Sequence, residues 1–383
     1  MTEDLPPHRG LLPAGFGDTL PPDAAREAHL IETLMHRFDL NGYQRVQPPL
    51  VEFETTLLSG AGAALGEQIY RIMDPESQRM MGLRADTTPQ IARIATTRMA
   101  GAPRPLRLAY AGPCLLVRGT QMAPERQVSQ AGIELIGPDL PQADAEAILV
   151  AADALRASGI GSMSIDLTMP PLIPALIGNA ALGAADRAEL AHALDRKDAA
   201  AIARHGGDGA NSLCTLLDAT GLAPRALDMI AQIDLPKPAR ALADRLAAIV
   251  ACIAAADPDL RVTIDPVEFR GYRYHTGAAV TIFAPGRQVE LGRGGRYLCE
   301  NGESATGITL YPDTALRVAP KLILRARLYL PADAPVEAGA AARAQGFATI
   351  AGLSPVADLV HEAGRLGCSH LWRDGAIIDL SGV

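Results

Sequence analysis

The chain has 383 residues, of which 48% are hydrophobic and 20% charged, and its formal net charge is −8. This length exceeds what one simple core usually spans, so we expect two or more structural units. The acidic balance argues against a general nucleic-acid binder. The five cysteines are scattered, without a CxxC motif or a His/Cys cluster, which indicates reduced thiols and neither a disulfide framework nor a zinc site.

Targeting and membrane segments are not expected from this sequence. The amino-terminal stretch is polar, acidic and proline-rich, and it lacks the basic start and apolar core of a signal peptide. A run of about 18 apolar residues, which a spanning helix needs, does not occur. These features predict a soluble cytoplasmic protein.

The first part of the chain is predicted to fold as a helix followed by strands. Apolar residues recur at helical spacing in DAAREAHLIETLMHRF (23–38). The following YQRVQPPLVEFETTLL reads as a strand interrupted by two prolines (48–49), which favours a sheet edge or an interface. MMGLRADTTPQIARIATTRMAG then turns from strand to helix, with Thr88 as the N-cap and Pro89 at the first helical position.

Residues 112–137 are predicted to form two strands joined by a long polar turn. The second strand alternates between polar and apolar residues, so Gln130 and Glu134 fall on the same face and can present two polar groups to a small ligand. The first strand ends in three apolar residues (115–117), where a pocket for a charged ligand would need donors.

Helices dominate the middle of the chain, with residues 170–256 almost wholly helical. Strands are predicted on either side of this block, in SMSIDLTMP, RVTIDP, EFRGYRYHTGAAVTIFAPG and RQVELGRGGRY. The segment 324–383 alternates strand, helix, strand, helix and strand, the last being SHLWRDGAIIDL, which describes a small α/β unit. A core of residues 1–323 whose strands are interrupted by helices indicates an α+β fold and not a doubly wound sheet.

Two short motifs near the end of the core suggest ligand contacts. GRGGRY (292–297) lacks the spacing of a dinucleotide fingerprint or a P-loop, which leaves a tight turn at a ligand or a plain hairpin. RGYRYH (270–275) reads as a strand with Arg270 and Tyr274 on one face and His275 on the other. An arginine flanked by tyrosines suits a carboxylate or phosphate, although a solvated strand face explains the same residues.

In their order and spacing, these segments resemble the catalytic core of histidyl-tRNA synthetase, a class II synthetase, over roughly residues 8–320. The matching segments are PAGFGDTLPP, GYQRVQPPLVE, LRADTTPQIAR, GPCLLVRG…ERQVSQAGIELIG, EFRGYRYHTG and GGRY…ATGITL. The resemblance implies an antiparallel sheet flanked by helices, with a helical insert. It also implies that the core dimerises through the region around residues 48–49.

The resemblance also implies which residues would bind histidine and which would have bound ATP. Positions that correspond to the histidine site are Asp86, Thr88, Gln130, Glu134, Arg270, Tyr274 and His275. Asp86 replaces a glutamate and His275 a tyrosine, which bears on affinity and ligand identity. Leu116, Arg118 and Thr314 stand where the synthetases carry an arginine, a glutamate and an arginine near ATP. Because adenylate formation depends on positioned cations, activation should weaken by orders of magnitude.

A synthetase-like core with a degenerate ATP site and a short tail of about 60 residues resembles the regulatory subunits of ATP phosphoribosyltransferase. This family implies a non-catalytic partner of the short-form catalytic subunit in the first step of histidine biosynthesis. It further implies a homodimeric core within a hetero-octamer and feedback inhibition by L-histidine as effector. The short tail and the acidic charge argue against tRNA binding, and no cofactor or metal is indicated.

One alternative function and three structural questions stay open. The alternative is a ligase that activates histidine with ATP, for which Arg270 is the main argument, and Arg118 or Arg317 would then have to replace the lost contacts. The sequence does not decide whether regulatory histidine occupies the old amino-acid pocket or a subunit junction. Neither the surface that receives the catalytic subunit nor the stoichiometry follows from it.

Overall fold

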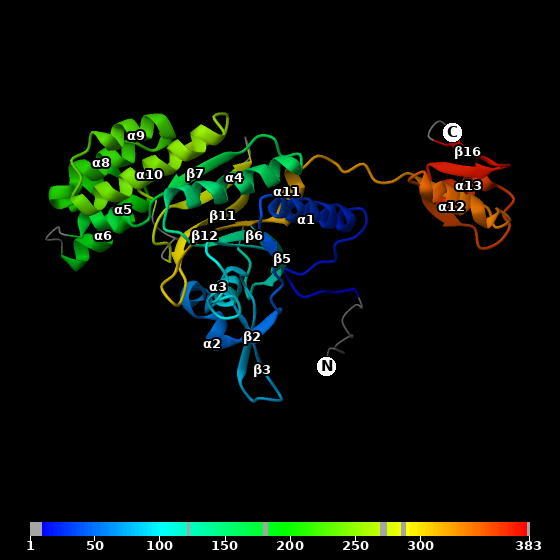
Figure 1. The fold of residues 1–383 in the computed structure, drawn as a ribbon, viewed down its shortest axis with the longest axis horizontal. Helices are drawn as coiled ribbons and strands as arrows, with labels where there is room; N and C mark the ends of the chain where they lie inside the picture. The colour runs from blue at the N-terminus through cyan, green and yellow to red at the C-terminus, as the bar shows by residue number, and fades with distance from the viewer. Residues whose placement is uncertain (1–9, 121–122, 179–182, 269–273, 285–288, 381–383) are drawn as a thin grey trace, which may run out of the picture. The chain divides into compact units, whose positions relative to one another are not determined.

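The computed structural model describes residues 10–120, 123–178, 183–268, 274–284 and 289–380 (Figure 1). The chain divides into two compact units, and the boundary falls between Pro320 and Lys321. The larger unit, called the core below, is built on a nine-stranded sheet and a three-stranded sheet. The smaller unit contains a four-stranded sheet.

The nine-stranded core sheet has the order β1-β5-β6-β12-β11-β10-β7-β9-β8. Its strands are β1 (Gln44–Arg45), β5 (Leu106–Leu115), β6 (Gln127–Gly137), β7 (Ser164–Thr168), β8 (Gly221–Leu222), β9 (Arg261–Ile264), β10 (Ala279–Ala284), β11 (Val289–Leu298) and β12 (Ser304–Leu310). Every neighbouring pair from β5 to β7 is antiparallel, whereas β1 joins β5 and β9 joins β7 in parallel. This antiparallel-rich sheet confirms the predicted α+β class.

Helices α1 (Asp23–Leu40), α4 (Pro141–Ala157) and α11 (Pro312–Val318) lie on one face of the core sheet (Figure 1). As the spacing predicts, α1 buries one stripe of apolar side chains: Leu30, Leu34, Met35 and Phe38. They share the main hydrophobic core with Ala131, Ile133 and Leu135, the odd-numbered residues of β6. The even-numbered residues of β6 therefore point to the opposite face.

After β7, the chain forms a block of helices, interrupted by the short strand β8, before it returns to the sheet at β9. These helices are α5 (Leu172–Ile177), α6 (Ala184–Asp195), α7 (Ala199–His205), α8 (Ala210–Asp218), α9 (Ala223–Ala231) and α10 (Lys237–Ala256), with a short 3-10 turn at Gly207–Gly209. Apolar residues of α5, α8, α9 and α10 join the same hydrophobic core as α4. Among the helices that the structure describes, none is both long and apolar enough to cross a bilayer.

The other face of the core sheet carries helix α3 (Thr88–Thr96) and a small second sheet (Figure 1). This sheet consists of β2 (Val51–Phe53), β4 (Met80–Leu83) and β3 (Tyr70–Met73), with α2 (Glu54–Leu57) and a 3-10 helix (Gly60–Leu65) between β2 and β3. The single interrupted strand predicted here is wrong, whereas its predicted place at a sheet edge is confirmed, because β1 and β2 are each an edge strand of their sheet. The prolines at 48–49 separate β1, in the large sheet, from β2, in the small one, because proline lacks the N–H that a sheet interior requires.

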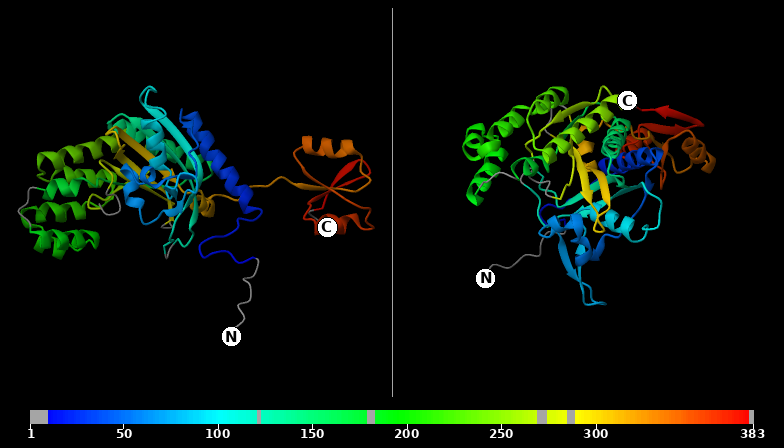
Figure 2. Two further views of the ribbon diagram at one scale, coloured as in Figure 1. Left: turned by 90° about the horizontal axis from the view of Figure 1, so that it is seen from below. Right: turned by 60° about the vertical axis from the view of Figure 1, so that its left-hand side comes forward.

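The smaller unit alternates strands and helices and has helices on both sides of its sheet (Figure 2). Its elements are β13 (Arg327–Leu330), α12 (Val336–Ala344), β14 (Ala348–Ala351), α13 (Leu359–Arg365), β15 (His370–Arg373) and β16 (Ala376–Asp379), in the sheet order β14-β13-β15-β16. The single last strand predicted from the sequence is wrong. Asp374 and Gly375, with φ of 50° and 85°, form a two-residue turn between β15 and β16, and an Asp-Gly pair is typical of such hairpins.

Candidate functional site

A pocket opens in the core on the sheet face that carries α3. The space inside it, including the part open to solvent, is about 350 Å³. The lining residues are Asp86, Thr88, Glu134, Tyr274, Arg293, Gly294, Gly295, Tyr297, Gly307, Thr309 and Tyr311. They come from the start of α3, from the turn before β10, from β6, β11 and β12, and from the residue that follows β12.

The register of the core sheet brings Glu134 into this pocket. Ile133 and Leu135 point toward α1 and α4, so Glu134 and Gln130 point to the α3 face, as the alternation in β6 predicts. Glu134 is paired with Gly307 of β12, and Gly307 is paired with Gly295 of β11. A buried carboxyl group therefore lies beside a row of residues without side chains.

The glycines in this row are required by the side chains that pack over them. A Cβ on Gly307 would lie 1.8 Å from Oε2 of Glu134, and a Cβ on Gly295 would lie 2.5 Å from Cδ2 of His275. Gly295 also has a φ of +148°, which side chains disfavour. Residues 292–297 lie within β11, so the strand predicted for RQVELGRGGRY is confirmed, whereas the turn or hairpin suggested for GRGGRY is wrong.

Glu134 is a buried acid with unusual protonation. Its side chain is 1% exposed, and its Oε2 accepts a hydrogen bond of 2.9 Å from the hydroxyl of Tyr297. Desolvation, aided by the charge of Asp86, raises the pKa of Glu134 to about 8, although hydrogen bonds from Tyr297 and Thr88 oppose the shift. In the empty pocket this carboxyl is thus mostly protonated at neutral pH, and a cation beside it would favour loss of the proton.

Asp86 is held in place by the start of α3 and by Gln130. Its Oδ1 accepts a hydrogen bond of 2.8 Å from the backbone N–H of Thr88, and its Oδ2 accepts one of 2.9 Å from Nε2 of Gln130. Gln130 itself is buried beneath the pocket, where its Oε1 accepts from the N–H of Thr87 at 3.1 Å. Gln130 therefore positions Asp86 and does not line the pocket.

The N-cap predicted at Thr88 is wrong by one residue. Helix α3 begins at Thr88, its N-cap is Thr87, and no side chain of the cap bonds to the helix. The hydroxyl of Thr88 lies 3.3 Å from that of Tyr110, which in turn lies 2.7 Å from Oγ1 of Thr309. Thr88 is thereby part of a chain of hydroxyl groups at the pocket wall.

The histidine-signature segment is described only in part. Arg270 lies outside the described residues, as do Tyr272 and Arg273. Tyr274 and His275 precede β10 in a turn and do not belong to a strand, so the faces predicted for these two residues are wrong. Their ring centroids are 4.0 Å apart; Tyr274 lines the pocket, whereas His275 is buried against Gly295.

Several residues of the site were not predicted from the sequence: Arg293, Tyr297, Thr309 and Tyr311, which line the pocket, and Tyr110, whose hydroxyl contacts those of Thr88 and Thr309. Alternation within β5, β11 and β12 gives each of these strands two faces, but it does not indicate which face meets Glu134. The missing information is the pairing between strands that are up to 200 residues apart in the sequence, such as β5 and β12 on either side of β6. Only the register in which these strands pair shows that the residues lie together at the pocket.

The three positions that correspond to the synthetase ATP site lie in different surroundings. Leu116 packs into a small apolar cluster with Leu57, Ile69 and Ala85. Arg118 is exposed, and Thr314 is half-buried in α11. The nearby Arg317 forms an ion pair of 2.9 Å with Glu125 of the hairpin loop.

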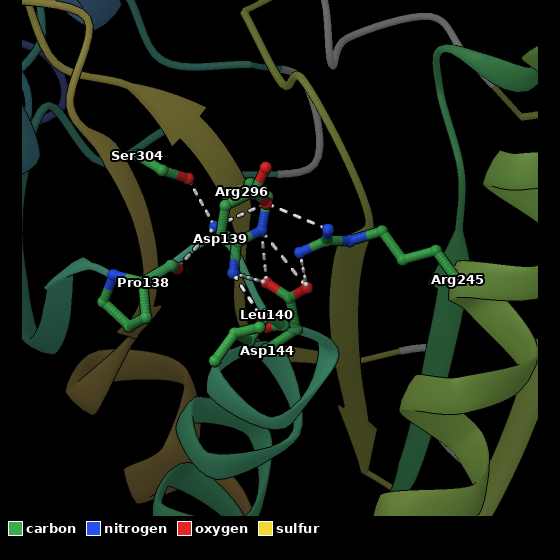
Figure 3. Close-up of polar contacts among 7 residues, drawn as sticks. All are labelled: Pro138, Asp139, Leu140, Asp144, Arg245, Arg296 and Ser304. Atoms are coloured by element: carbon green, nitrogen blue, oxygen red, sulfur yellow. Dashed lines mark hydrogen bonds and ion pairs between the residues drawn. The ribbon is translucent and has the colours of Figure 1, made fainter.

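A buried ion network supports the pocket from the side of α4 (Figure 3). Arg296, which precedes Tyr297 in β11, pairs with Asp144 at 2.8 Å, and both side chains are 3% exposed. Arg245 of α10 reaches the same carboxylate at 3.0 Å and also pairs with Asp139 at 2.9 Å. The network therefore joins β11, the start of α4 and the helical block. In the described ranges, no three His, Cys, Asp or Glu side chains gather as metal ligands do.

Comparison with known proteins places this geometry in a family. The model of the histidyl-tRNA synthetase family matches residues 15–315. A protein from Gluconobacter oxydans named ATP phosphoribosyltransferase regulatory subunit is 51% identical over 370 residues, covering 97% of each chain. The chain belongs to the family of ATP phosphoribosyltransferase regulatory subunits. A protein of the same name from Rhodospirillum centenum is 50% identical and covers 99% of each chain.

Solved structures of this regulatory-subunit family and of the synthetases share the fold. An ATP phosphoribosyltransferase regulatory subunit/histidyl-tRNA synthetase from Bacillus halodurans C superposes with a TM-score of 0.81 at 22% identity, covering 94% of this chain and 97% of that one. Histidyl-tRNA synthetase from Nostoc sp. PCC 7120 gives a TM-score of 0.77 at 16% identity, covering 97% and 94%. The predicted class II synthetase-like architecture is confirmed.

Proposed function

We propose that this chain is the non-catalytic regulatory subunit of an ATP phosphoribosyltransferase. In the cytoplasm it would act with a short-form catalytic subunit in the first step of histidine biosynthesis, and it would confer inhibition by L-histidine. The observation that carries the proposal is the 51% identity, over 97% of each chain, to a relative that bears this name.

The effector site of this proposal is the core pocket, with L-histidine as its ligand. Asp86 and Glu134 bring two carboxyl groups to one small cavity, and such a pair suits an ammonium group. The pocket is concave and is lined by few residues, which suits a free amino acid and not a macromolecule. A second possible location, a junction between subunits, would leave this pocket without a role in inhibition.

The surroundings of the ATP-site positions support a non-catalytic role. Leu116 contributes to an apolar cluster, and Arg317 is engaged with Glu125. Loss of one charge-assisted contact costs about 1.5–3 kcal/mol, so two lost contacts would slow adenylate formation by orders of magnitude. The competing function, a ligase that activates histidine, predicts histidine-dependent exchange of pyrophosphate into ATP, whereas our proposal predicts no exchange above background.

The assembly in this proposal is a homodimer of the core joined by catalytic subunits, with a hetero-octamer as the expected stoichiometry. Histidine would shift its activity only if it binds the active and inhibited arrangements with different affinity. A coupling of about 1–3 kcal/mol is typical of such systems.

Formation of phosphoribosyl-ATP by the short catalytic subunit of the same organism tests the proposal. The reaction would be run without this chain, with it, and with it in the presence of L-histidine. We expect activity that depends on the chain and falls as histidine is added. Equal activity with and without the chain would refute the regulatory role.

A further inference from the structure

The pocket contains a cation that the proposed function does not use. Among its described lining residues, Asp86 and Glu134 are acidic, and Arg293 is the single side chain with a fixed positive charge. A ligand that carries both a positive and a negative group would need such a cation for its negative end. The position of Arg293 therefore bears on what the pocket selects.

The sheet register sets Arg293 and Glu134 at different places on the same face. Arg293 of β11 is paired with Thr309 of β12. Two residues further along the strands, Gly295 is paired with Gly307, and Gly307 is paired with Glu134 of β6. β12 lies between β11 and β6, and neighbouring strands are about 4.8 Å apart. Arg293 and Glu134 are therefore two strand spacings apart across the sheet and offset by two residues along the strands. The intervening glycines leave that space open to a ligand.

Charges of both signs act on Tyr311, which also lines the pocket. Desolvation raises the pKa of Tyr311, the positive charge of Arg293 lowers it, and the charges of Glu290 and Asp86 raise it. One phenol thus lies within electrostatic reach of both Arg293 and Asp86. A cation and two carboxyl groups thus line the same pocket.

Arg293 already binds a carboxylate, that of Glu290. Nε of Arg293 donates to Oε1 of Glu290 at 2.5 Å, and Nη2 donates to Oε2 at 2.7 Å. This two-pronged geometry is the one that arginine offers to any carboxylate. The side chains are 48% and 27% exposed, and an ion pair that water reaches is weak. Another carboxylate can replace Glu290 at little cost.

We propose that the Glu290–Arg293 pair selects ligands that carry a carboxylate next to their ammonium group. The α-carboxylate of the ligand would displace Glu290 and take its place on Arg293, while the ammonium group pairs with Asp86 and Glu134. The pocket would then accept free amino acids and reject the corresponding amines. This inference rests on the proposed binding of L-histidine in the pocket.

Isothermal titration calorimetry of the full-length chain with two probes tests this selection. L-histidine carries the carboxylate, and histamine is the same molecule without it. The variants are Arg293→Gln, which removes the cation, and Glu290→Gln, which removes the competing carboxylate. Arg317→Gln is the matched control, because Arg317 forms an exposed ion pair with Glu125 and does not line the pocket.

The two variants should change L-histidine affinity in opposite directions. We expect Arg293→Gln to weaken L-histidine roughly tenfold or more, as loss of a charge-assisted contact does, and to change histamine by less than about twofold. Glu290→Gln should strengthen L-histidine several-fold, roughly, and leave histamine nearly unchanged, because it removes only the competitor. A gain in affinity cannot arise from misfolding.

Two different failures can be told apart. If wild-type chain binds L-histidine but Arg293→Gln weakens both probes equally or neither, the selection by Arg293 is refuted while the histidine site stands. If the wild-type chain binds no L-histidine, both this inference and the proposed effector site are refuted. The Arg317→Gln control should behave as wild type with both probes.

Discussion

The hydroxyl of Tyr297 donates a hydrogen bond of 2.9 Å to Oε2 of Glu134, and both residues are almost fully buried. Tyr297 comes from β11 and Glu134 from β6, and β12 lies between these strands. The bond crosses the glycine at position 307 and fixes the carboxyl at the back of the pocket. It also partly offsets the desolvation of that carboxyl. The ionisation of Glu134 is therefore linked to the geometry of three strands.

The raised pKa of Glu134 predicts a pH dependence of ligand binding. A carboxyl with a pKa of about 8 must release its proton before it pairs with an ammonium group. Affinity should therefore rise with pH up to about 8 and then level off, by roughly tenfold per pH unit at most. Calorimetry between about pH 6 and 9 would measure the ratio of wild-type to Glu134→Gln affinities for L-histidine, in which the ligand's own titration cancels. A ratio that does not vary with pH would contradict this linkage.

Tyr297→Phe should raise the pKa of Glu134 further and lower stability. The hydrogen bond from Tyr297 lowers that pKa, and its removal leaves a buried acceptor without this donor. We expect the free energy of unfolding to fall by about 1–3 kcal/mol in urea titrations. The pH at which L-histidine affinity levels off should move above that of wild type. Unchanged stability together with an unchanged pH profile would show that the bond is unimportant.

Gly307→Ala should damage the pocket, because the added Cβ would lie 1.8 Å from Oε2 of Glu134. The buried carboxyl would have to shift away from its position next to Tyr297. We expect a loss of about 1–3 kcal/mol in the free energy of unfolding, together with loss of L-histidine binding by calorimetry. Gly101→Ala is the control, since a Cβ there meets nothing within 4 Å. Wild-type binding by Gly307→Ala would show that the pocket is not formed as described.

Asp144→Asn should destabilise the core much more than loss of an exposed ion pair. Asp144 is the shared carboxylate of the network in Figure 3, and its removal leaves the buried guanidinium of Arg296 with one longer ion pair, of 3.4 Å, to the exposed Asp139. Breaking a buried pair in this way costs about 3–5 kcal/mol. Arg45→Gln breaks an ion pair with Glu32 whose side chains are 49% and 66% exposed, and should cost less than about 1 kcal/mol. Equal losses in urea unfolding would contradict this contrast.

Sequence patterns correctly predict those parts of the fold that depend only on the spacing of residues within one helix or strand. The apolar stripe of α1 and the alternation of β6 follow from side-chain spacing alone, so their buried faces were predicted correctly. The Asp-Gly turn between β15 and β16 also has a local signal, because an Asp-Gly pair is typical of two-residue hairpin turns. The order of motifs along the chain correctly predicted the synthetase-like core.

The pocket depends on contacts that no local pattern contains. The glycines of GRGGRY suggested a turn, but Gly295 is required because a ring from position 275 packs over it within the sheet. Arg293 and Thr309 become pocket residues only through the pairing of β11 with β12. Leu116 looked misplaced in a polar site, and its packing partners come from α2 and from segments near β3 and β4. Tertiary pairing determines each of these roles.

Histidine inhibition of the reconstituted phosphoribosyltransferase tests most directly whether this pocket controls the partner enzyme. The inhibition curve would be measured with wild-type chain and with Glu134→Ala, after assembly of each with the catalytic subunit has been verified by size-exclusion chromatography. We predict that the Glu134→Ala complex assembles and requires at least roughly tenfold more histidine for half inhibition, because a charge-assisted contact is lost. The same inhibition curve for both complexes would contradict the account and locate the histidine sensor elsewhere.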